Sequence, residues 1–328
     1  MSHSLPPEKS VLGAPFDACN QLAAAKNANL YRAAMRLSPE RQRFFLASYA
    51  SMRVIDDIVD DGFLELSDAE RDAHRENIIQ TIDQWQAQII SAKAGAENPL
   101  PETGPLNNDV YEALRATLGR SDLSPEPWVE LADALHRDVA EEPMDEWDDF
   151  IAYCEGATAA PASIFVYLLS ARYDPDIGYT SPLTNSPVYH ARDMAIFCYI
   201  IHILRDLPED IKGPDRLVTI PAEMLIAADI TLGEIRNVIG QGKYDDLDYL
   251  GGILLERAWE HFETGQARSG ELLSILDTDE ADTLSRLFTV YIELGGSMME
   301  NGYASFLKDR DTIMQTTAQN NLPDVNKP

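Results

Sequence analysis

Two pairs of aspartates, each with a spacing of four residues, are the part of this sequence best suited to chemistry. The first pair is Asp56 and Asp60, and the second is Asp206 and Asp210. On a helix, residues i and i+4 lie on one face, so each pair brings two negative charges together. An exposed pair of this kind costs about 0.2–0.5 kcal/mol unless a cation lies between its members. Carboxylate oxygens without nearby thiol ligands favour a hard ion, so both pairs predict Mg²⁺ binding.

Cationic side chains accompany both aspartate pairs. Arg53 precedes the first pair on nearly the same helical face, and Arg205 lies directly before the second pair. Lys212 and Arg216 follow the second pair in a Gly- and Pro-containing loop. Arginine beside a carboxylate–metal site suits a diphosphate, because the metal bridges carboxylate to phosphate and the guanidinium binds the remaining oxygens. We therefore expect Arg53, Arg205 and Arg216 to contact a diphosphate, with Lys212 assisting.

Each pair also has a plainer interpretation. The first could be the solvated acidic end of a helix, although Val54, Ile55 and Val59 tie the segment to a core. The second could be a salt-bridged helix terminus. Pro208 lies between its two aspartates and lacks a backbone N–H, so it should kink or loosen the helix there. The occurrence of two such motifs in one helical chain favours the diphosphate–metal interpretation.

Composition restricts the class of protein. The 328 residues carry a formal net charge of −29, which repels nucleic acids and anionic membranes, so no nucleic-acid partner is expected. The three cysteines form no metal or disulfide pattern, and the first residues do not resemble a signal peptide. The longest apolar run, Met194 to Leu204, is about half of a bilayer span. These features predict a soluble cytoplasmic protein with at most peripheral membrane contact.

The rest of the chain predicts an all-α fold in one domain that covers residues 16–311. Residues 1–15 and 312–328 are expected to be flexible. Residues 94–106 and 173–187 are predicted loops by their Gly and Pro content. The predicted helices are 17–36, 39–62, 67–93, 107–119, 125–140, 147–172, 186–211, 221–240, 243–277 and 279–308.

Four segments carry a family resemblance. YASMRVIDDIVD, residues 49–60, resembles the pattern Y-A-x-x-R-x-x-D-D-x-V-D, and HILRDLPED, residues 202–210, resembles N-I-x-R-D-x-x-E-D. The Tyr153-Cys154 dipeptide and the segment NGYASF, residues 301–306, match two further family signatures. In order and spacing these segments resemble the squalene/phytoene synthase family of head-to-head prenyl synthases, and the chain looks like a divergent member.

The resemblance implies an isoprenoid synthase-type helical bundle around a central apolar cavity. It implies that Asp56, Asp60, Asp206 and Asp210 hold Mg²⁺. Such enzymes ionise an allylic prenyl diphosphate, farnesyl or geranylgeranyl, and join two chains through a cyclopropylcarbinyl diphosphate to a squalene- or phytoene-type product. No dinucleotide fingerprint is visible, so NADPH use cannot be read from the chain. Substrate length and oligomeric state also stay open.

The chain departs from the family pattern at three positions. His202 replaces an asparagine, Tyr199 replaces a glutamine, and Glu155 follows Cys154 without the tyrosine that members often carry nearby. His202 could donate to diphosphate or be a core histidine, and Glu155 could be an acid or base or a surface residue. With the four aspartates, these two complete the candidate catalytic residues. The departures concern rearrangement of the cyclopropyl intermediate more than ionisation.

Aromatic side chains could line the prenyl cavity, although each could equally be ordinary core. The candidates are Phe44, Phe45, Phe165 and Tyr199. Two other functions stay open. A divergent enzyme could release an alcohol or a cyclic product, and a non-catalytic family member could bind prenyl lipids.

Overall fold

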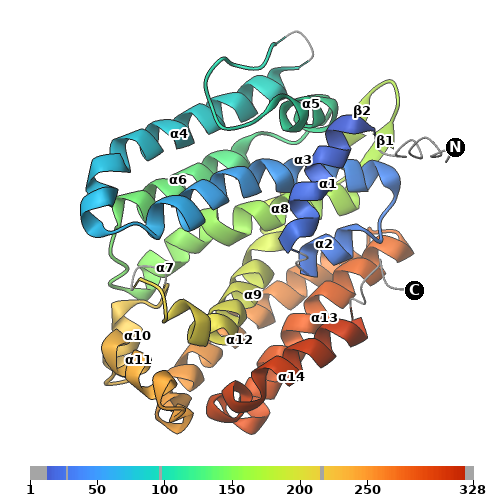
Figure 1. Cartoon of the computed structure of the whole chain (residues 1–328). Helices are drawn as coiled ribbons and strands as arrows, with labels where there is room; N and C mark the ends of the chain where they lie inside the picture. Colours follow the sequence, from blue (N-terminus) through green and yellow to red (C-terminus); the bar gives the residue numbers. More distant parts are fainter. Residues whose placement is uncertain (1–12, 27–28, 96–97, 215–217, 322–328) are drawn as a thin grey trace, which may run out of the picture.

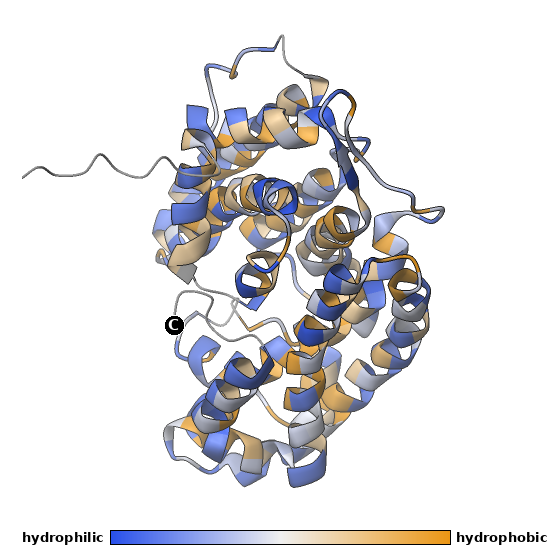
Figure 2. Ribbon diagram, turned by 90° about the vertical axis from the view of Figure 1, so that its right-hand side faces the viewer, coloured by the Kyte–Doolittle hydropathy of each residue, from blue (hydrophilic) through white to orange (hydrophobic). Residues whose placement is uncertain are grey.

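Helices make up nearly all the regular structure of the chain, as the sequence predicts (Figure 1). The computed structural model describes residues 13–26, 29–95, 98–214 and 218–321. The helices of the first half of the chain form the upper part of the view in Figure 1, and α9 to α14 form most of the lower part. Apolar residues gather on the faces that the helices turn toward one another (Figure 2). The prediction of an all-α fold is confirmed.

The first half of the chain supplies eight of the labelled helices in the described ranges. They are α1 (Ala14–Lys26), α2 (Asn29–Ala34), α3 (Pro39–Asp56), α4 (Asp68–Ala94), α5 (Asn108–Thr117), α6 (Glu126–Ala140), α7 (Trp147–Cys154) and α8 (Ala160–Ser170). A short 3₁₀ turn, Leu118–Arg120, follows α5.

The second half begins with a long helix that packs against α8, α12 and α13. Its helices are α9 (Pro187–Asp210), α10 (Ala222–Ala227), α11 (Leu232–Gly240), α12 (Asp248–Leu273), α13 (Thr278–Asn301) and α14 (Tyr303–Asn321). A 3₁₀ turn, Tyr244–Leu247, precedes α12.

Several helices begin at the predicted signals. α3 begins at Pro39, directly after Ser38. Before α4, the backbone N–H and the hydroxyl of Ser67 both donate to the Glu70 carboxylate, at 3.0 and 2.6 Å. This capping box supplies partners that the first turn of a helix otherwise lacks.

Several predicted helices are divided in the structure, and the span 17–36 becomes α1 and α2. The span 221–240 becomes α10 and α11, because Thr231 and Glu234 form a capping box that starts a new helix. The span 279–308 breaks at Gly302, whose φ of +83° favours glycine. The following helix, α14, continues to Asn321, so the folded domain extends beyond the predicted end at residue 311.

Two π-helical segments interrupt predicted α-helices. Asp57–Leu64 follows α3 directly, and Glu155–Ala159 separates α7 from α8. A π-helix pairs residue i with residue i+5 and often marks a functional site. In the second segment, a Cβ on Gly156 would collide with the carbonyl of Glu130 on α6. Glycine at this position therefore permits the close approach of the segment to α6.

The predicted loop 173–187 contains regular structure that the sequence analysis missed. β1 (Arg172–Asp174) and β2 (Gly178–Thr180) form an antiparallel hairpin in which Arg172 lies opposite Thr180. Tyr179 of this hairpin is buried, and its ring centroid lies 5.0 Å from that of Phe44 on α3. Packing on the bundle, rather than local strand preference, accounts for this short hairpin.

Two buried tryptophans hold the middle of α3. The indole of Trp85 on α4 donates to the Ser51 carbonyl at 2.8 Å, and the indole of Trp128 on α6 donates to the Ser51 hydroxyl at 3.0 Å. All three residues are fully buried. These bonds satisfy both indole donors and fix α3 between two neighbouring helices.

One stretch of the described chain, Trp147–Ser170, is long and apolar enough to cross a membrane by length and composition. Within its most apolar window, 61% is buried inside the bundle. This is the pattern of a core helix of the bundle, which contributes Phe150, Phe165 and Tyr167 to the hydrophobic core.

Candidate active site

The first aspartate pair lies where α3 passes into the π-helical segment. Asp56 is the last residue of α3 and is partly exposed, while Asp60 is exposed. Arg53 forms an ion pair with Asp57, and its guanidinium also lies 3.7 Å from Asp56 and 3.8 Å from Asp61. One arginine therefore balances several carboxylates at this end of α3.

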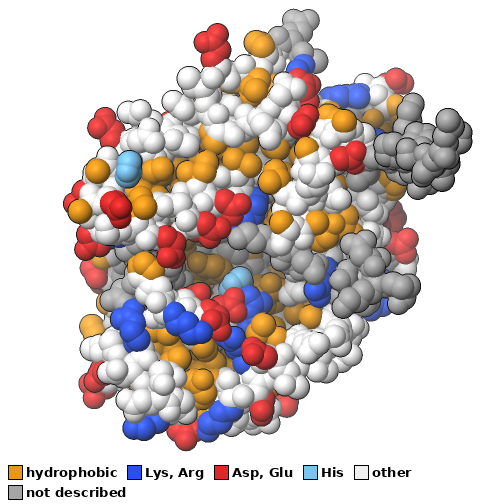
Figure 3. Space-filling model, viewed as in Figure 1, with side chains coloured by type: hydrophobic (Ala, Val, Ile, Leu, Met, Phe, Trp, Pro, Cys, Tyr) orange, Lys and Arg blue, Asp and Glu red, His pale blue; other side chains and the backbone are white. Residues whose placement is uncertain are grey.

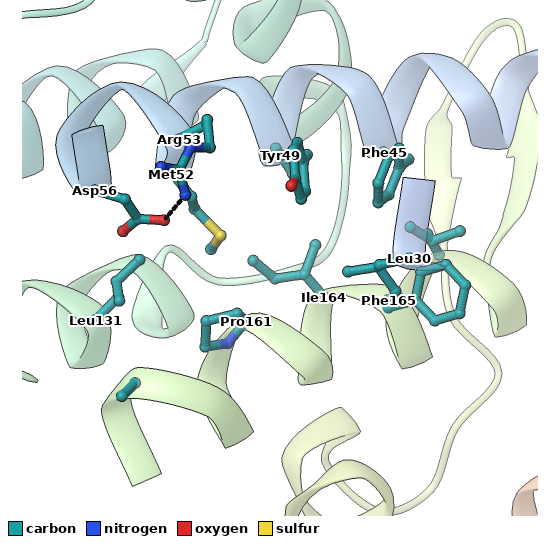
Figure 4. A pocket seen from close by; sticks show the side chains of 13 residues that line it. Leu30, Phe45, Tyr49, Met52, Arg53, Asp56, Leu131, Pro161, Ile164 and Phe165 are labelled. Carbon is teal, nitrogen blue, oxygen red and sulfur yellow. Dashed lines mark ion pairs between the residues drawn. The ribbon is translucent and has the colours of Figure 1, made fainter. Parts of the chain in front are cut away.

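An apolar cavity of about 160 Å³ ends at this acidic group (Figure 4). On α3, Phe45, Tyr49, Arg53 and Asp56 follow one another along the face that lines it. The opposite wall is apolar and comes mostly from α6 and α8. It consists of Leu131, Pro161, Ile164, Phe165 and Leu168. The cavity is therefore charged at one end and apolar along the rest of its length.

A second apolar cavity of about 200 Å³ adjoins the first. It lies between α8, α9 and α13, where Met194, Cys198 and Tyr291 contribute to its lining. The two cavities have four lining residues in common. These are Leu30, Ala157, Pro161 and Phe165.

The second aspartate pair occupies the last turns of α9. Arg205 binds the Asp206 carboxylate with two hydrogen bonds, of 2.7 and 2.5 Å. His202 Nε2 lies 2.8 Å from Asp206 Oδ2. The carboxylate is thereby oriented by a forked arginine contact and by an imidazole one helical turn earlier.

The two acids of this pair have different proton affinities. Burial acts to raise the pKa of Asp206, but hydrogen bonds from Arg205 and His202 outweigh it and hold that pKa well below its usual range. Burial and the negative charge of Asp206 raise the pKa of Asp210 to about 6. Asp206 is therefore ionised at neutral pH, while Asp210 retains a tendency to bind a cation or a proton.

A further acid, which the sequence did not predict, lies beside the first aspartate pair. Burial and the negative charges of Asp60 and Asp56 raise the pKa of Asp138, on α6, to about 7. The hydroxyl of Tyr153 donates to Asp138 Oδ2 at 3.1 Å. Acidic residues are common in this chain, and no motif singles out Asp138, so only the packing of α6 on the π-helical segment Asp57–Leu64 reveals it.

Aromatic residues connect the surroundings of the two aspartate pairs. The ring of Tyr199 lies 6.5 Å from that of Tyr153, which binds Asp138 near the first pair, and 6.4 Å from that of His202, which binds Asp206. In the space-filling view, acidic side chains gather on both sides of a hollow in this face, with a histidine beside the lower group (Figure 3).

The donor set fits Mg²⁺ by its chemistry. Both pairs offer carboxylate oxygens, and the raised pKa of Asp210 marks a negative charge that lacks full compensation. Among the described residues, no three or more His, Cys, Asp or Glu side chains converge as a preformed metal cluster. Each pair therefore supplies only part of a coordination shell, and water or phosphate oxygens would have to complete it.

Two of the other predicted polar residues form ion pairs with groups outside the two aspartate pairs. Glu155 forms an ion pair with Arg192 at 2.5 Å. This partner belongs to neither aspartate pair. Lys212 binds Glu209 at 2.7 Å on the exposed end of α9. Arg216 lies outside the described residues.

The predicted cavity residues divide into two groups. Phe45 and Phe165 line the first cavity, and their rings pack edge to face with centroids 6.3 Å apart. Phe44 lines neither of the two cavities and packs against Tyr167 and Tyr179 in the core, because it lies on another face of α3. Tyr199 stacks on Phe150 and also lies outside the lining of both cavities.

The fold is similar to those of solved prenyl synthases. The squalene synthase HpnC from Alicyclobacillus acidocaldarius aligns with a TM-score of 0.64 at 18% identity, over 88% of this chain and 94% of that one. A dehydrosqualene synthase aligns with a TM-score of 0.60 at 16% identity, over 93% of this chain and 96% of that one. At these identities the similarity shows the isoprenoid synthase fold.

Sequence comparison gives the family. Phytoene synthase 1 of Arabidopsis thaliana is 23% identical over 209 residues, which cover 63% of this chain and 44% of that protein. The phytoene synthase of Narcissus pseudonarcissus is 22% identical over 212 residues, again 63% and 44%. The chain thus matches less than half the length of these relatives. The squalene/phytoene synthase family profile matches residues 23–311, and the chain belongs to this family.

Proposed function

We propose that the protein condenses two prenyl diphosphates head to head in a Mg²⁺-dependent reaction. The substrates are farnesyl or geranylgeranyl diphosphate, and the first product is a cyclopropylcarbinyl diphosphate that leads to a squalene- or phytoene-type hydrocarbon. The family and the names of its relatives, which are squalene, dehydrosqualene and phytoene synthases, support this class of reaction.

The observation that carries the proposal is the cavity that begins at Arg53 and Asp56 and continues between aromatic and aliphatic side chains. A prenyl diphosphate has the same division into a charged head and an apolar tail. Burial of the tail contributes about 0.8 kcal/mol per CH₂ group, and the head meets a guanidinium. The second cavity along α8 offers space for a second tail beside the first.

The residues of the site have separate tasks in this proposal. Arg53 and Arg205 bind and orient diphosphate oxygens, and Asp56, Asp60, Asp206 and Asp210 hold the metal. Mg²⁺, when bound, neutralises negative charge on the leaving diphosphate. Phe45, Phe165 and their neighbours exclude water, which protects a carbocation from capture.

The proposed reaction begins with ionisation of one substrate and ends with reduction or deprotonation of a carbocation. The C1–O bond of one substrate breaks, and its electron pair leaves with the diphosphate. The double bond of the second substrate supplies the electron pair for the new C–C bond, and loss of one proton closes the cyclopropane ring. The C–O bond of the cyclopropylcarbinyl diphosphate then breaks, and its electron pair leaves with the second diphosphate to give a later cation. Reduction of this cation requires a hydride donor such as NADPH, whereas loss of a proton gives a dehydrosqualene- or phytoene-type product.

The test is incubation of the purified protein with Mg²⁺ and each prenyl diphosphate, with and without NADPH, followed by mass spectrometry of the organic extract. Asp56→Asn and Asp206→Asn are the site variants. Asp133→Asn, an exposed position on α6, is the matched control. The proposal predicts a C30 or C40 hydrocarbon that is lost in both site variants and kept in the control.

Other products have defined meanings. A prenyl alcohol or a cyclic product would show that the carbocation is captured by water or cyclises instead of condensing with a second substrate. It would point to roles for His202 and Glu155, where the chain departs from the family pattern. Binding of both substrates with no turnover would support a lipid-binding role and contradict the proposal.

A further inference from the structure

The last helix of the fold reaches the turn that carries the second aspartate pair. The hydroxyl of Tyr303, at the start of α14, donates to the carbonyl of Leu204 on α9 at 2.7 Å. Farther along α14, Arg310 Nη1 donates to the carbonyl of Arg205 at 3.3 Å. These carbonyls belong to the two residues that precede Asp206. Two side chains of α14 therefore bind backbone of the helix that presents the acids.

The Leu204 carbonyl needs an outside donor because of Pro208. In an α-helix the N–H of residue 208 donates to the carbonyl of residue 204, and proline has no N–H. Leu204 is fully buried, so water cannot take this place. A buried carbonyl without a partner is destabilising, because it loses its hydrogen bond to water and gains none. The Tyr303 hydroxyl supplies the missing bond, and α9 continues through Pro208 to Asp210.

Three local features hold Tyr303 where this bond is possible. Gly302 turns the chain with a φ of +83°, and Asp248 accepts the N–H of Ala304 at 2.6 Å. On α12, a Cβ at Gly251 would collide with the Tyr303 ring, so the absence of a side chain there makes room for the ring. The ring is 2% exposed. The hydroxyl is thus placed by the turn at Gly302 and by Asp248 and Gly251 of α12.

Arg310 adds a second point of attachment. It binds Glu209 at 2.7 Å in addition to the Arg205 carbonyl, and its side chain is 14% exposed. Glu209 and Pro208 lie between Asp206 and Asp210. Arg310 therefore contacts the residue directly before Asp206 and the residue directly before Asp210.

We infer that Tyr303 and Arg310 are positioning residues for the second aspartate pair, with Tyr303 replacing the backbone hydrogen bond that Pro208 removes. Neither residue has to touch the substrate for this role. They fix the direction in which Asp206 and Asp210 project, as supporting residues do in other metal and catalytic sites. The catalytic consequence rests on the proposed function, whereas the positioning itself does not.

The main experiment is a double-mutant cycle of Tyr303→Phe and Pro208→Ala. Phenylalanine keeps the buried ring and removes only the hydroxyl, and alanine in place of Pro208 restores the backbone N–H. Mg²⁺ affinity is measured by calorimetry in the presence of inorganic diphosphate. With Pro208 in place, Tyr303→Phe should weaken it about two- to tenfold, the equivalent of one hydrogen bond. In the Pro208→Ala background, the same change should weaken it by less than about twofold. An equal loss in both backgrounds, or no loss in either, would overturn the inference.

A second measurement does not depend on metal binding or turnover. Hydrogen exchange in the full-length protein should become faster in residues 205–213 of Tyr303→Phe and of Arg310→Met, with no change in α3. Exchange that rises throughout the bundle would indicate a general packing role and contradict positioning. If no prenyl substrate is turned over, the proposed function fails, and these two measurements still decide the inference.

Discussion

The hydroxyl of Tyr153 donates to the carboxylate of Asp138 at 3.1 Å, and this bond joins α7 to α6 directly beside the first aspartate pair. A hydrogen bond to the carboxylate lowers its pKa, yet burial and the charges of Asp60 and Asp56 outweigh it. The site therefore contains an acid that ionises at a cost in the absence of a counter-cation.

Replacement of Asp138 by Asn should stabilise the protein at high pH. The raised pKa, about 7 against 3.8, means that the folded state binds the proton more tightly than the unfolded state. Stability from this group is present at low pH and falls as the pH rises through about 7. Asp138→Asn should increase the free energy of unfolding by about 1–2 kcal/mol at pH 8, with little change near pH 4. Urea unfolding at both pH values measures this, with Asp133→Asn as the control.

Mg²⁺ affinity should fall as the pH drops below about 6. The pKa of Asp210 is raised to about 6, and a protonated carboxyl is a poor metal ligand. Affinity should then decrease up to about tenfold for each further pH unit, until Asp210 is no longer a ligand. Calorimetric titration of the protein with Mg²⁺ from about pH 5 to pH 8 gives the profile.

Asp210→Asn should bind Mg²⁺ more weakly and remove this pH dependence near pH 6. Asp309→Asn, an exposed change on α14, should leave the profile as in the parent protein. An unchanged pH profile in Asp210→Asn would show that another group controls metal binding.

Arg53→Lys should reduce kcat/KM for the prenyl diphosphate about ten- to hundredfold. Lysine keeps the positive charge but loses the fork that reaches Asp56, Asp57 and Asp61 at once. Loss of charge-assisted hydrogen bonds is worth about 1.5–3 kcal/mol. Steady-state kinetics test this, and Arg137→Lys, whose partner Glu142 is exposed, serves as the comparison. Similar kinetics in both variants would remove Arg53 from the substrate contacts.

Phe165→Leu should shift preference toward the longer prenyl substrate. Phe165 lines both cavities, so a smaller side chain lengthens the space for the tails. The ratio of geranylgeranyl to farnesyl turnover measures the shift. Phe44→Leu is the matched control, since Phe44 is equally buried but packs on Tyr167 and Tyr179. It should cost about 1–2 kcal/mol of stability and leave the ratio unchanged. A shift of the turnover ratio in Phe44→Leu would mean that substrate preference responds to general loosening of the core and not to the cavity wall.

The contrast between Phe44 and Phe45 shows what helical periodicity could have predicted. Phe45, Tyr49 and Arg53 recur every fourth residue, and Asp56 follows three later, so one face of α3 carries all four. Phe44 is offset by one residue and points elsewhere. The helical spacing from Asp56 back to Phe45 therefore identifies the face of α3 that lines the cavity. Residue type alone does not distinguish Phe45 from Phe44.

Other parts of the site depend on tertiary contacts. The π-helical segment Asp57–Leu64 carries no local signal that separates it from the end of an α-helix, since its extra residue is accommodated by packing on α4 and α6. Asp138 gains its role only where α6 packs on this π-helical segment. By contrast, the sequence places Arg205 directly beside Asp206, but residues i and i+1 of a helix do not face each other, so it does not predict their forked ion pair.

The wall that the two cavities share has a consequence for how product range can change. Ala157, Pro161 and Phe165 face both cavities from a single short stretch of chain. A substitution in this stretch alters the volume of both cavities together, so under the proposed function the spaces for the two prenyl tails cannot change independently through it. Under the proposed function, selection or engineering that acts here should favour pairs of equal chain length, and a variant that joins two different lengths would have to diverge through α3 on one side and α13 on the other.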